Sequence, residues 1–414
     1  MERQNGNATP VFRRKNVLIW TLLVLVVLAT TLFYVAITPA HTWIASLFHS
    51  QVAVAPLPSS NSDATMFGYD LQHTRYNTKE HQLTISNVSH LQLTWSVATN
   101  DQIISSPVVD NGAVFFGSNN KHFYALNSKD GKVLWSYVAK ADIGSSPAVA
   151  NGIVYVGSSD DKVYAFNERT GALAWSYNTS NSVWSSPSVA HGIVYVGSND
   201  TTLYALDART GKGLWGQATD NFVSSSPAVV NGVVYVGSED GNLYAFDAQT
   251  GDRLWHVLLG TAIRVSSPAV VNGVVYIGSE DDNLYALDSH TGKTLWKAAT
   301  KNYIHSSPAV ANGIVYIGST DGNLYAFNAL TGQPLWKTAT GAAIFSSPTV
   351  ANGVVYIGSQ DDKLYALDAE TGTVLWSYKT GEPIDSSPTI TNGMLYVGSW
   401  DGNLYAFGLP SEAA

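Results

Sequence analysis

The fold of this chain is decided by a stretch that reads Val223-Ser-Ser-Ser-Pro-Ala-Val-Val-Asn-Gly-Val-Val-Tyr-Val-Gly-Ser-Glu-Asp-Gly-Asn-Leu-Tyr-Ala-Phe-Asp-Ala-Gln-Thr-Gly-Asp-Arg-Leu-Trp255. Its apolar runs are short, rich in Val and Tyr, and separated by turns that contain Gly. Such runs predict β-strands, and Asn231-Gly232 is a dipeptide that strongly favours a tight hairpin. We expect four strands in this unit, at residues 223–230, 233–238, 243–247 and 252–258.

Eight copies of this unit follow one another from about residue 90 to the end of the chain. The step between copies is 40 residues, except that one residue is added between Trp255 and Trp296. A period near 40 with several short strands in each copy is typical of a propeller blade. The copies are marked by a Ser-Ser-Pro tripeptide that begins at Ser105, Ser145, Ser185, Ser225, Ser266, Ser306, Ser346 and Ser386. They are also marked by Trp95, Trp135, Trp175, Trp215, Trp255, Trp296, Trp336 and Trp376.

The predicted strands differ in side-chain size, and a radial arrangement of blades explains the difference. Blades converge on an axis, so the innermost strand has room only for Ser and Ala. Trp fills the wide gap between the outer strands, where its indole N–H needs an acceptor. Proline is tolerated in the innermost strand because one edge of that strand faces the channel. We therefore expect the eight repeated Trp residues to dock neighbouring blades together.

The strand count predicts how the ring closes. The last copy ends at Gly408-Leu-Pro-Ser-Glu-Ala-Ala414 without a Trp strand of its own. An unmatched Trp strand, Leu91-Gln-Leu-Thr-Trp-Ser-Val97, precedes the first Ser-Ser-Pro. Pairing these two segments leaves no open blade edge. The expected fold is all-β, a closed eight-bladed propeller of four-stranded antiparallel blades at residues 67–414.

Composition restricts the classes of partner and chemistry. The chain has 414 residues, of which 45% are hydrophobic and 13% are charged. The first 16 residues carry a net charge of +3, which leaves −12 for the remainder of a chain whose total is −9. This argues against nucleic acid as a partner, because such binding relies on basic surface. No cysteine is present, which excludes disulfides, thiol catalysis and Cys-ligated metals.

An uncharged run of 21 residues, Val17 to Ile37, follows Arg13-Arg14-Lys15. Spanning a bilayer takes about 20 apolar residues, whereas the core of a secretory signal has roughly 7–15. The length favours a retained transmembrane helix, and its basic flank places the N-terminus in the cytoplasm. The alternative is a signal peptide cleaved after Ala40. The predicted organisation is a single-pass protein of the cell membrane with an extracytoplasmic propeller, divided into a cytoplasmic tail at 1–16, a signal anchor at 17–38, a linker at 39–66 and the propeller.

Residue types that carry chemistry recur in this chain, but their spacing favours structural roles. One Asp stands in the turn between the second and third strands of seven copies, as ordinary turn chemistry, whereas a calcium loop needs several alternating carboxylates. No Gly-x-Ser-x-Gly elbow is present, and the 10 histidines lack the paired spacing of a zinc site. We predict no catalytic residue and no metal site. The repeated turn residues are Asp160, Asp200, Asp240, Asp281, Asp321, Asp361 and Asp401.

Two segments resemble a known family. The element Ala-Phe-Asp-Ala-Gln-Thr-Gly-Asp-Arg-Leu-Trp255 is similar to the tryptophan-docking motif of quinoprotein-type propellers. The lead-in Phe67-Gly-Tyr-Asp-Leu-Gln-His-Thr-Arg-Tyr-Asn77 resembles the start of pyrroloquinoline-quinone (PQQ) alcohol dehydrogenases. The same type of propeller also serves as a non-enzymatic scaffold in the β-barrel assembly lipoprotein. The resemblance therefore implies the fold and leaves both kinds of activity open.

The chain also departs from both relatives. The resemblance to the dehydrogenases would imply PQQ, metal ligands and a catalytic Asp, which those enzymes hold in long insertions, often with a cysteine pair. The copies in this chain differ in length by a single residue, so no such insertion is present. The lipid-accepting Cys of the lipoprotein is missing too. We therefore predict no cofactor, with PQQ disfavoured, and we favour a non-enzyme over an enzyme.

One position differs from copy to copy although the rest of the unit is repeated closely. It precedes Ser-Ser-Pro, in the loop from outer to inner strand, so its side chains should ring one mouth of the channel. The extra residue of the longer copy, near Arg264, falls in the same loop. Trp400 is expected on the same face of the propeller as this loop. The alternative is drift of an exposed position after duplication. The position holds Ile104, Gly144, Trp184, Ser224, Val265, His305, Phe345 and Asp385. We predict a ligand or partner site formed by Trp184, Arg264, His305, Phe345, Asp385 and Trp400.

Together these features predict a membrane-anchored, extracytoplasmic propeller that acts as a non-catalytic binding or scaffold module for a protein or a small ligand. Two alternatives stay open. One is a PQQ-dependent, dehydrogenase-like enzyme that uses the channel, supported only by fold analogy. The other is a purely structural surface module without a small ligand.

Overall fold

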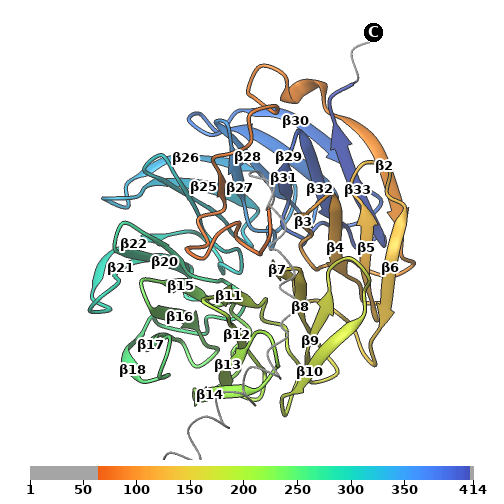
Figure 1. Cartoon of the computed structure of the whole chain (residues 1–414). Helices are drawn as coiled ribbons and strands as arrows, with labels where there is room; N and C mark the ends of the chain where they lie inside the picture. The colour runs from red at the N-terminus through yellow and green to blue at the C-terminus, as the bar shows by residue number, and fades with distance from the viewer. Residues whose placement is uncertain (1–63, 411–414) are drawn as a thin grey trace, which may run out of the picture. The chain divides into compact units, whose positions relative to one another are not determined.

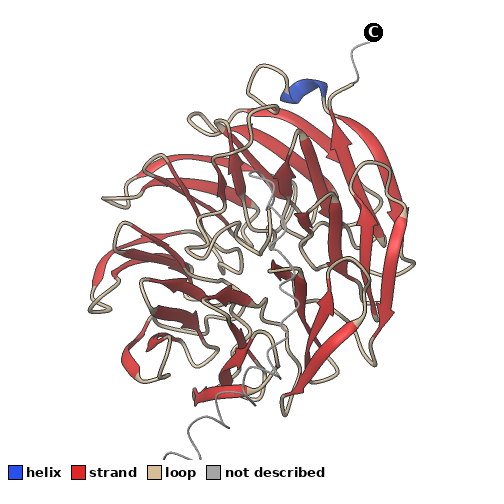
Figure 2. Cartoon of the chain, viewed as in Figure 1, coloured by secondary structure: helices blue, strands red, loops and turns tan. Residues whose placement is uncertain are grey.

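The computed structural model describes residues 64–410, and these residues form eight sheets arranged around a common axis (Figure 1). Each sheet has four antiparallel strands, and one sheet carries the additional two-residue parallel strand β1 (Tyr76–Asn77). Strands make up most of each blade, and the short helical turn in Figure 2 is the 3-10 helix η1 (Val88–His90). The chain is therefore an all-β, eight-bladed propeller, as expected.

Strand lengths follow the distance from the axis. The inner strands have three residues each, and they are β3 (Val108–Asp110), β7 (Ala148–Ala150), β11 (Ser188–Ala190), β15 (Ala228–Val230), β19 (Ala269–Val271), β23 (Ala309–Ala311), β27 (Thr349–Ala351) and β31 (Thr389–Thr391). The second strands are β4 (Ala113–Gly117), β8 (Ile153–Ser158), β12 (Ile193–Gly197), β16 (Val233–Gly237), β20 (Val274–Gly278), β24 (Ile314–Gly318), β28 (Val354–Gly358) and β32 (Met394–Gly398).

The third and outer strands are longer than the inner ones. The third strands are β5 (His122–Asn127), β9 (Lys162–Asn167), β13 (Thr202–Asp207), β17 (Asn242–Asp247), β21 (Asn283–Asp288), β25 (Asn323–Asn328), β29 (Lys363–Asp368) and β33 (Asn403–Gly408). The outer strands are β6 (Val133–Val138), β10 (Leu173–Asn178), β14 (Gly213–Ala218), β18 (Arg253–Leu258), β22 (Thr294–Ala299), β26 (Pro334–Ala339), β30 (Val374–Lys379) and β2 (Gln92–Ala98).

The two ends of the propeller meet in one blade. Strand β2 pairs antiparallel with β33, from Gln92 opposite Gly408 to Ala98 opposite Asn403. Figure 1 shows this pairing as an orange strand beside a blue one. The first long strand of the chain is thus the outer strand of a blade whose other strands are the last three, so no blade of the described part lacks an outer strand.

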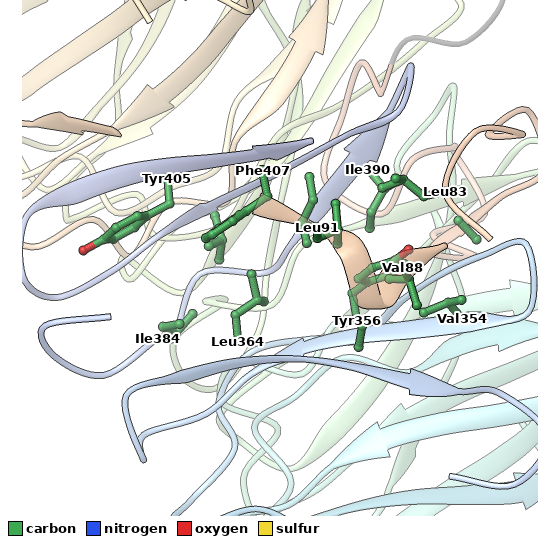
Figure 3. Close-up of a cluster of buried hydrophobic side chains, with 14 residues drawn as sticks. Leu83, Val88, Leu91, Val354, Tyr356, Leu364, Ile384, Ile390, Tyr405 and Phe407 are labelled. Atoms are coloured by element: carbon green, nitrogen blue, oxygen red, sulfur yellow. The ribbon is translucent and has the colours of Figure 1, made fainter. Parts of the chain in front are cut away.

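Apolar side chains fill the spaces between blades. In Figure 3, Tyr356 and Phe407 come from two adjacent blades and lie in one buried cluster. Leu83, Val88 and Leu91 from the segment before β2 pack into the same cluster, and all three are buried. The second and third strands of each blade are buried on both faces, because a neighbouring blade covers each face.

The repeated Trp residues join each blade to the next. Trp175 donates its indole N–H to the carbonyl oxygen of Ala208 at 2.9 Å. Gly211 lies on the same indole at φ +71°, where a Cβ atom would come within 2.6 Å of the ring. The Thr-Gly turn therefore needs glycine both for its left-handed backbone and for close contact with Trp. Equivalent indole-to-carbonyl hydrogen bonds are made by Trp95, Trp135, Trp215, Trp255, Trp296, Trp336 and Trp376.

The inner strands are shorter than predicted, because Ser-Ser-Pro precedes them. In the unit quoted above, the expected strand at 223–230 is limited to Ala228–Val230. The backbone N–H of Ser226 donates to Oγ of Ser267 in the next blade at 2.9 Å instead of joining a ladder within its own sheet. The corresponding second serines of all eight units form an unbroken ring of such bonds. Serine is thus required here for hydrogen bonding as well as for its small size.

The free inner edge that was expected to face the channel is occupied. Residues 64–77, which we call the strap, cross the axis and bond to the inner strands. For example, N–H groups of Val109 and Val350 donate to the carbonyl oxygens of Ala64 and Arg75, each at 2.8 Å. The strap makes hydrogen bonds to inner-strand residues of all eight blades, namely Val109, Val149, Ser188, Val229, Val270, Val310, Val350 and Ile390. Ala64 and Thr65, within the predicted linker, already take part in these bonds.

The predicted tail at 1–16, signal anchor at 17–38 and most of the linker lie outside the described residues. Within residues 64–410, no helix is long and apolar enough to span a bilayer.

Candidate functional site

A cavity of about 360 Å³ lies on the propeller axis, and residues from all eight units line it. We call this cavity the cup. Along each inner segment the variable position comes first, then the two serines, then the strand that contacts the strap. The variable residues therefore form the rim of the cup, the second serines form its wall, and Phe67 of the strap lies at its floor. A volume of this size is within the range of small-molecule sites.

The structure brings five of the six predicted site residues to the rim of the cup. They are Trp184, Arg264, His305, Phe345 and Asp385, and all of them line the cavity. Trp184 is 51% exposed, so it is available for contact and is not part of the core between blades. The ring of His305 meets that of Phe345 edge-on, with centroids 5.0 Å apart. Their role in binding stays a prediction.

Trp400, the sixth predicted residue, does not line the cavity. It lies in the turn between β32 and β33, where its backbone N–H donates to the carbonyl oxygen of Pro383 at 2.9 Å. Pro383 is two residues from Asp385, so Trp400 stands behind the rim rather than on it.

A second ring of variable residues, of which Trp400 is one member, was not predicted from the sequence. This ring follows the Gly-Ser pair that ends each second strand, and its members contact the rim. Oγ of Ser224 donates to Oε1 of Glu239 at 3.1 Å, and Nε2 of Gln360 donates to Oδ1 of Asp385 at 3.3 Å. The signal was present in the sequence, because this position also differs among otherwise similar copies. Its occupants are Asn119, Ser159, Asn199, Glu239, Glu280, Thr320, Gln360 and Trp400.

Carboxylates outnumber cations when the rim and the second ring directly behind it are taken together. Nε of Arg264 lies 3.4 Å from Oε1 of Glu280 and 3.7 Å from Oε2 of Glu239, so one guanidinium is shared by two carboxylates. Both glutamates are only 14% exposed. His305 places Nε2 at 2.9 Å from Oε1 of Glu280, yet burial lowers the pKa of His305. The imidazole therefore adds no positive charge near neutral pH.

Asp385 is a carboxylate on the rim itself. Burial raises the pKa of Asp385 to about 6, because its contacts with the Gln360 amide and the Trp400 side chain only partly replace lost hydration. At pH 7 this group is mostly ionised. The cup therefore has one ionised carboxylate that no cation neutralises among the described residues around it.

A buried cation lies beneath the floor. The guanidinium of Arg75 lies 3.9 Å from the centre of the Phe67 ring, and Arg75 is 2% exposed. Burial lowers the pKa of Arg75 to about 9, although Asp70 opposes the shift. The strap backbone is unusual here, because Tyr69, His73 and Arg75 all have positive φ. Hydrogen bonds within the strap, such as Arg75 N–H to the Gly68 carbonyl oxygen at 3.1 Å, hold this conformation.

The repeated turn aspartates serve the blade itself. Asp321 accepts hydrogen bonds from the Tyr325 hydroxyl at 2.6 Å and from the Asn323 backbone N–H at 2.9 Å. Burial alone would raise the pKa of Asp321, but these hydrogen bonds outweigh it and lower the pKa. Within residues 64–410, no group of three or more His, Cys, Asp or Glu side chains could hold a metal ion.

A closed ring of eight four-stranded blades, docked by repeated Trp and Gly residues and open at a central cup, defines a propeller of the quinoprotein type. The chain belongs to the PQQ-like repeat family described as outer membrane protein assembly factor BamB, which matches residues 84–185, 180–301, 260–343 and 331–409. A comparison with curated protein sequences found no match.

Solved structures share this fold at low sequence identity. BamB from Moraxella catarrhalis is 23% identical, with a TM-score of 0.67 over 77% of this chain and 99% of that one. Quinohemoprotein alcohol dehydrogenase from Comamonas testosteroni is 17% identical, with a TM-score of 0.73 over 88% of this chain and 82% of that one. A europium-containing methanol dehydrogenase is 16% identical, with a TM-score of 0.73 over 84% and 98%. Both enzymes and a non-enzyme are thus similar in fold, so the likeness alone does not assign an activity.

Proposed function

We propose that this propeller is a non-catalytic binding module whose site is the cup. The observation that carries the proposal is the convergence of variable residues on one cavity. Trp184, Phe345 and Asp385 stand at equivalent places in three near-identical units, yet they share no chemistry. Polar and aromatic side chains converging on a concave surface are the usual composition of a ligand site.

Contacts between rim residues also support binding over drift. Side chains of the rim form hydrogen bonds with side chains of the second variable ring, as His305 does with Glu280 and Asp385 does with Gln360. Positions that drift freely on a surface have no reason to form complementary pairs. The pairs hold the rim side chains in place, and a preorganised site loses less entropy on binding.

The charges of the cup do not fit PQQ well. That cofactor carries three carboxylates, whereas the rim presents the Asp385 carboxylate and a single guanidinium, that of Arg264, whose charge Glu239 and Glu280 offset from directly behind the rim. The wall contributes serine hydroxyls, which carry no charge to balance the cofactor. Carboxylates of the cup would repel the carboxylates of the cofactor and so oppose its binding. A quinone-dependent reaction is therefore our second choice, although the similar enzymes share the fold.

A site-specific photocrosslinker tests the binding role in the full-length chain. Placed at Trp184, it should form one defined adduct in native membranes, because a bound partner or ligand covers the rim. Placed at Leu254, an exposed residue of outer strand β18, it should form none. Phe345→Ala should abolish the adduct at 184 while the thermal melt stays unchanged. Equal labelling at both positions would contradict the proposal, and PQQ-dependent alcohol oxidation by the purified chain would support the enzyme instead.

The predicted anchor would hold this module outside the cytoplasm. The proposal rests on the basic residues before the apolar run at 17–37, which lies outside the described part of the chain. Full-length protein should pellet with membranes and be cleaved by protease added to spheroplasts. A soluble form beginning at His41 would instead show that the segment is a cleaved signal.

A further inference from the structure

The wall of the cup has hydrogen-bonding capacity that the protein does not use. Each second serine accepts one backbone N–H through its Oγ, as Ser146 does from Ser106 at 2.9 Å. A hydroxyl offers one donor and two acceptor sites, so an O–H and a lone pair remain. For seven of the eight, no acceptor for the O–H lies within hydrogen-bonding reach among residues 64–410, and those seven line the cup: Ser106, Ser146, Ser186, Ser226, Ser307, Ser347 and Ser387.

The eighth serine, Ser267, is the exception, because its hydroxyl has an acceptor within the protein and the other seven hydroxyls face the cup. Ser267 belongs to the longer unit, and its hydroxyl donates to the carbonyl oxygen of Val265 at 3.4 Å. Ser267 alone among the eight does not line the cavity. The seven remaining side chains are at least nine-tenths buried, between 2% and 6% exposed. Buried hydroxyl groups are normally satisfied, so the wall is suited to a polar group inside the cup.

The rim above this wall is suited to positive charge. Directly behind the rim, Glu239 and Glu280 share the guanidinium of Arg264 and offset its charge, while among the described residues Asp385 on the rim is contacted only by the uncharged side chains of Gln360 and Trp400. Trp184 and Phe345 line the same cavity as Asp385. Carboxylates and aromatic rings together are the groups that recognise ammonium ions, including quaternary ones.

The floor restricts where such a charge can lie. The Arg75 guanidinium lies 3.9 Å from the centre of the Phe67 ring, and Arg75 itself does not line the cup. A second cation stacked on the cup side of the same ring would be repelled by it. The positive group therefore belongs at the rim, and the uncharged polar part of the ligand belongs among the serine hydroxyls.

We propose that the cup takes a small organic cation whose ammonium or guanidinium group lies at the rim and whose polar body hydrogen-bonds to the seven serine hydroxyls. The inference rests on the proposed function, because it names the ligand class of the same site. The cation can come from a free small molecule or from a basic side chain of a polypeptide, and both offer the same chemistry.

Choline tests the proposal, because its charge is permanent and it carries one hydroxyl. Titration calorimetry on the full-length chain at pH 7.5 compares choline with three analogues. These are 3,3-dimethylbutanol, which removes the charge, ethyltrimethylammonium, which removes the hydroxyl, and 3,3-dimethylbutanoate, which reverses the charge. We expect choline to bind at least tenfold more tightly than the neutral and anionic analogues, and several-fold more tightly than ethyltrimethylammonium. An acetylated, amidated Gly-Lys-Gly peptide reports on the polypeptide source, and tighter binding of the peptide would assign the site to a side chain.

Asp385 gives the test a pH dependence. The groups that face it from the neighbouring turns are Gln360 and Trp400, which do not titrate, while His305, Arg264 and Glu280 belong to other units. Choline affinity should fall several-fold between pH 7.5 and pH 5, because Asp385 becomes protonated near pH 6. Asp385→Asn should weaken binding at pH 7.5 about tenfold and remove the pH step. A step that persists in this variant would assign it to His305 and overturn the role of Asp385.

Matched variants separate charge at the rim from charge elsewhere. Glu280→Gln removes a carboxylate of the second ring that contacts Arg264 and His305 of the rim, whereas Glu370→Gln removes an exposed carboxylate in the turn after β29. We expect weaker choline binding only in the first, with the same thermal melt in both. If the neutral or anionic analogue binds as tightly as choline, the cation inference is wrong and the proposed function stands. If no analogue and no peptide binds, the cation inference is wrong, and the adduct at position 184 decides the proposed function separately.

Discussion

The repeated Trp residues and the turn glycines that contact them, which we call the docking belt, come from the same repeated unit as the rim of the cup. Residue types repeat in the docking belt, whereas they vary at the rim. In the belt, Trp175 has a counterpart in every blade and Gly211 has one against every docking Trp except Trp376, because each indole must fill a similar gap and reach a backbone carbonyl. At the rim, the equivalent position holds Gly144, Trp184 or Asp385. Residue types repeat wherever blades pack on or bond to one another, which includes the serine wall of the cup, and they vary in the loops that form the rim. The contrast separates residues that make the ring from residues that give the ring a specific surface.

Loss of the segments that complete the ring should have the largest effect. A chain that begins at Thr99 lacks β2 and the strap, so one blade has an exposed edge and eight inner strands lose their central partner. We expect aggregation or no cooperative unfolding transition, measured by circular dichroism and size exclusion. A chain that begins at Ala64 is the control, since it keeps every contact described above. Equal melting of the two chains would show that closure does not depend on the N-terminal segment.

Tryptophan substitutions compare the belt directly with the rim. Trp175→Ala should lower the free energy of unfolding by about 3–5 kcal/mol, because it leaves a cavity between blades and an unpaired carbonyl at Ala208. Trp184→Ala should change it by less than about 0.5 kcal/mol, since half of that side chain is already in water. Urea unfolding of both variants measures the difference. Similar losses would mean that the rim is part of the core.

Two glycines with the same backbone separate steric contact from conformational cost. Gly211 and Gly192 both have positive φ, but a Cβ at Gly192 would meet nothing within 4 Å. Gly192→Ala should therefore cost about 1–2 kcal/mol, the penalty of the left-handed backbone. Gly211→Ala should cost more than this, because its methyl group would displace the Trp175 ring. Equal costs from thermal unfolding would show that the belt tolerates movement of the indole.

The effect expected at Asp385, where burial of a carboxylate costs stability, appears only above about pH 4. The pKa of this carboxyl is about 6 in the folded chain, above its ordinary value of 3.8, so the folded state binds more protons between these values. The free energy of unfolding therefore falls as pH rises from about 4 through about 6. Asp385→Asn should raise it by about 1–3 kcal/mol at pH 8 and by little at pH 4. Glu370→Gln is the matched control. If the free energy of unfolding depends on pH in the same way in the parent and both variants, ionised Asp385 does not destabilise the folded chain.

Much of the fold followed from the repeat, and part of the site did too. The period located the blades, and the unmatched strand around Trp95 indicated closure, which the pairing of β2 with β33 provides. Four rim residues, Trp184, His305, Phe345 and Asp385, were predicted because the position before Ser-Ser-Pro varies among copies, and Arg264 was predicted from the extra residue of the longer copy. The strap was missed, because 64–77 has no counterpart in the repeat and its bonds run from its backbone to strands far along the chain. Glu239 and Glu280 were missed because they follow the Gly-Ser pair next to the repeated turn Asp, so they were taken as part of the turn.

The sequence by itself determined the number of blades, the docking Trp residues and the loops that reach the channel mouth. These are local and repeated properties, and hydrophobic periodicity, turn chemistry and side-chain size are enough to specify them. Only the tertiary structure decided that the channel is closed at one end by the strap, and that the second serines bond from blade to blade while facing a cavity. It also decided which carboxylates share Arg264. These features depend on distances between residues that lie tens to hundreds of positions apart, and those distances are set only when the eight blades have closed around the axis.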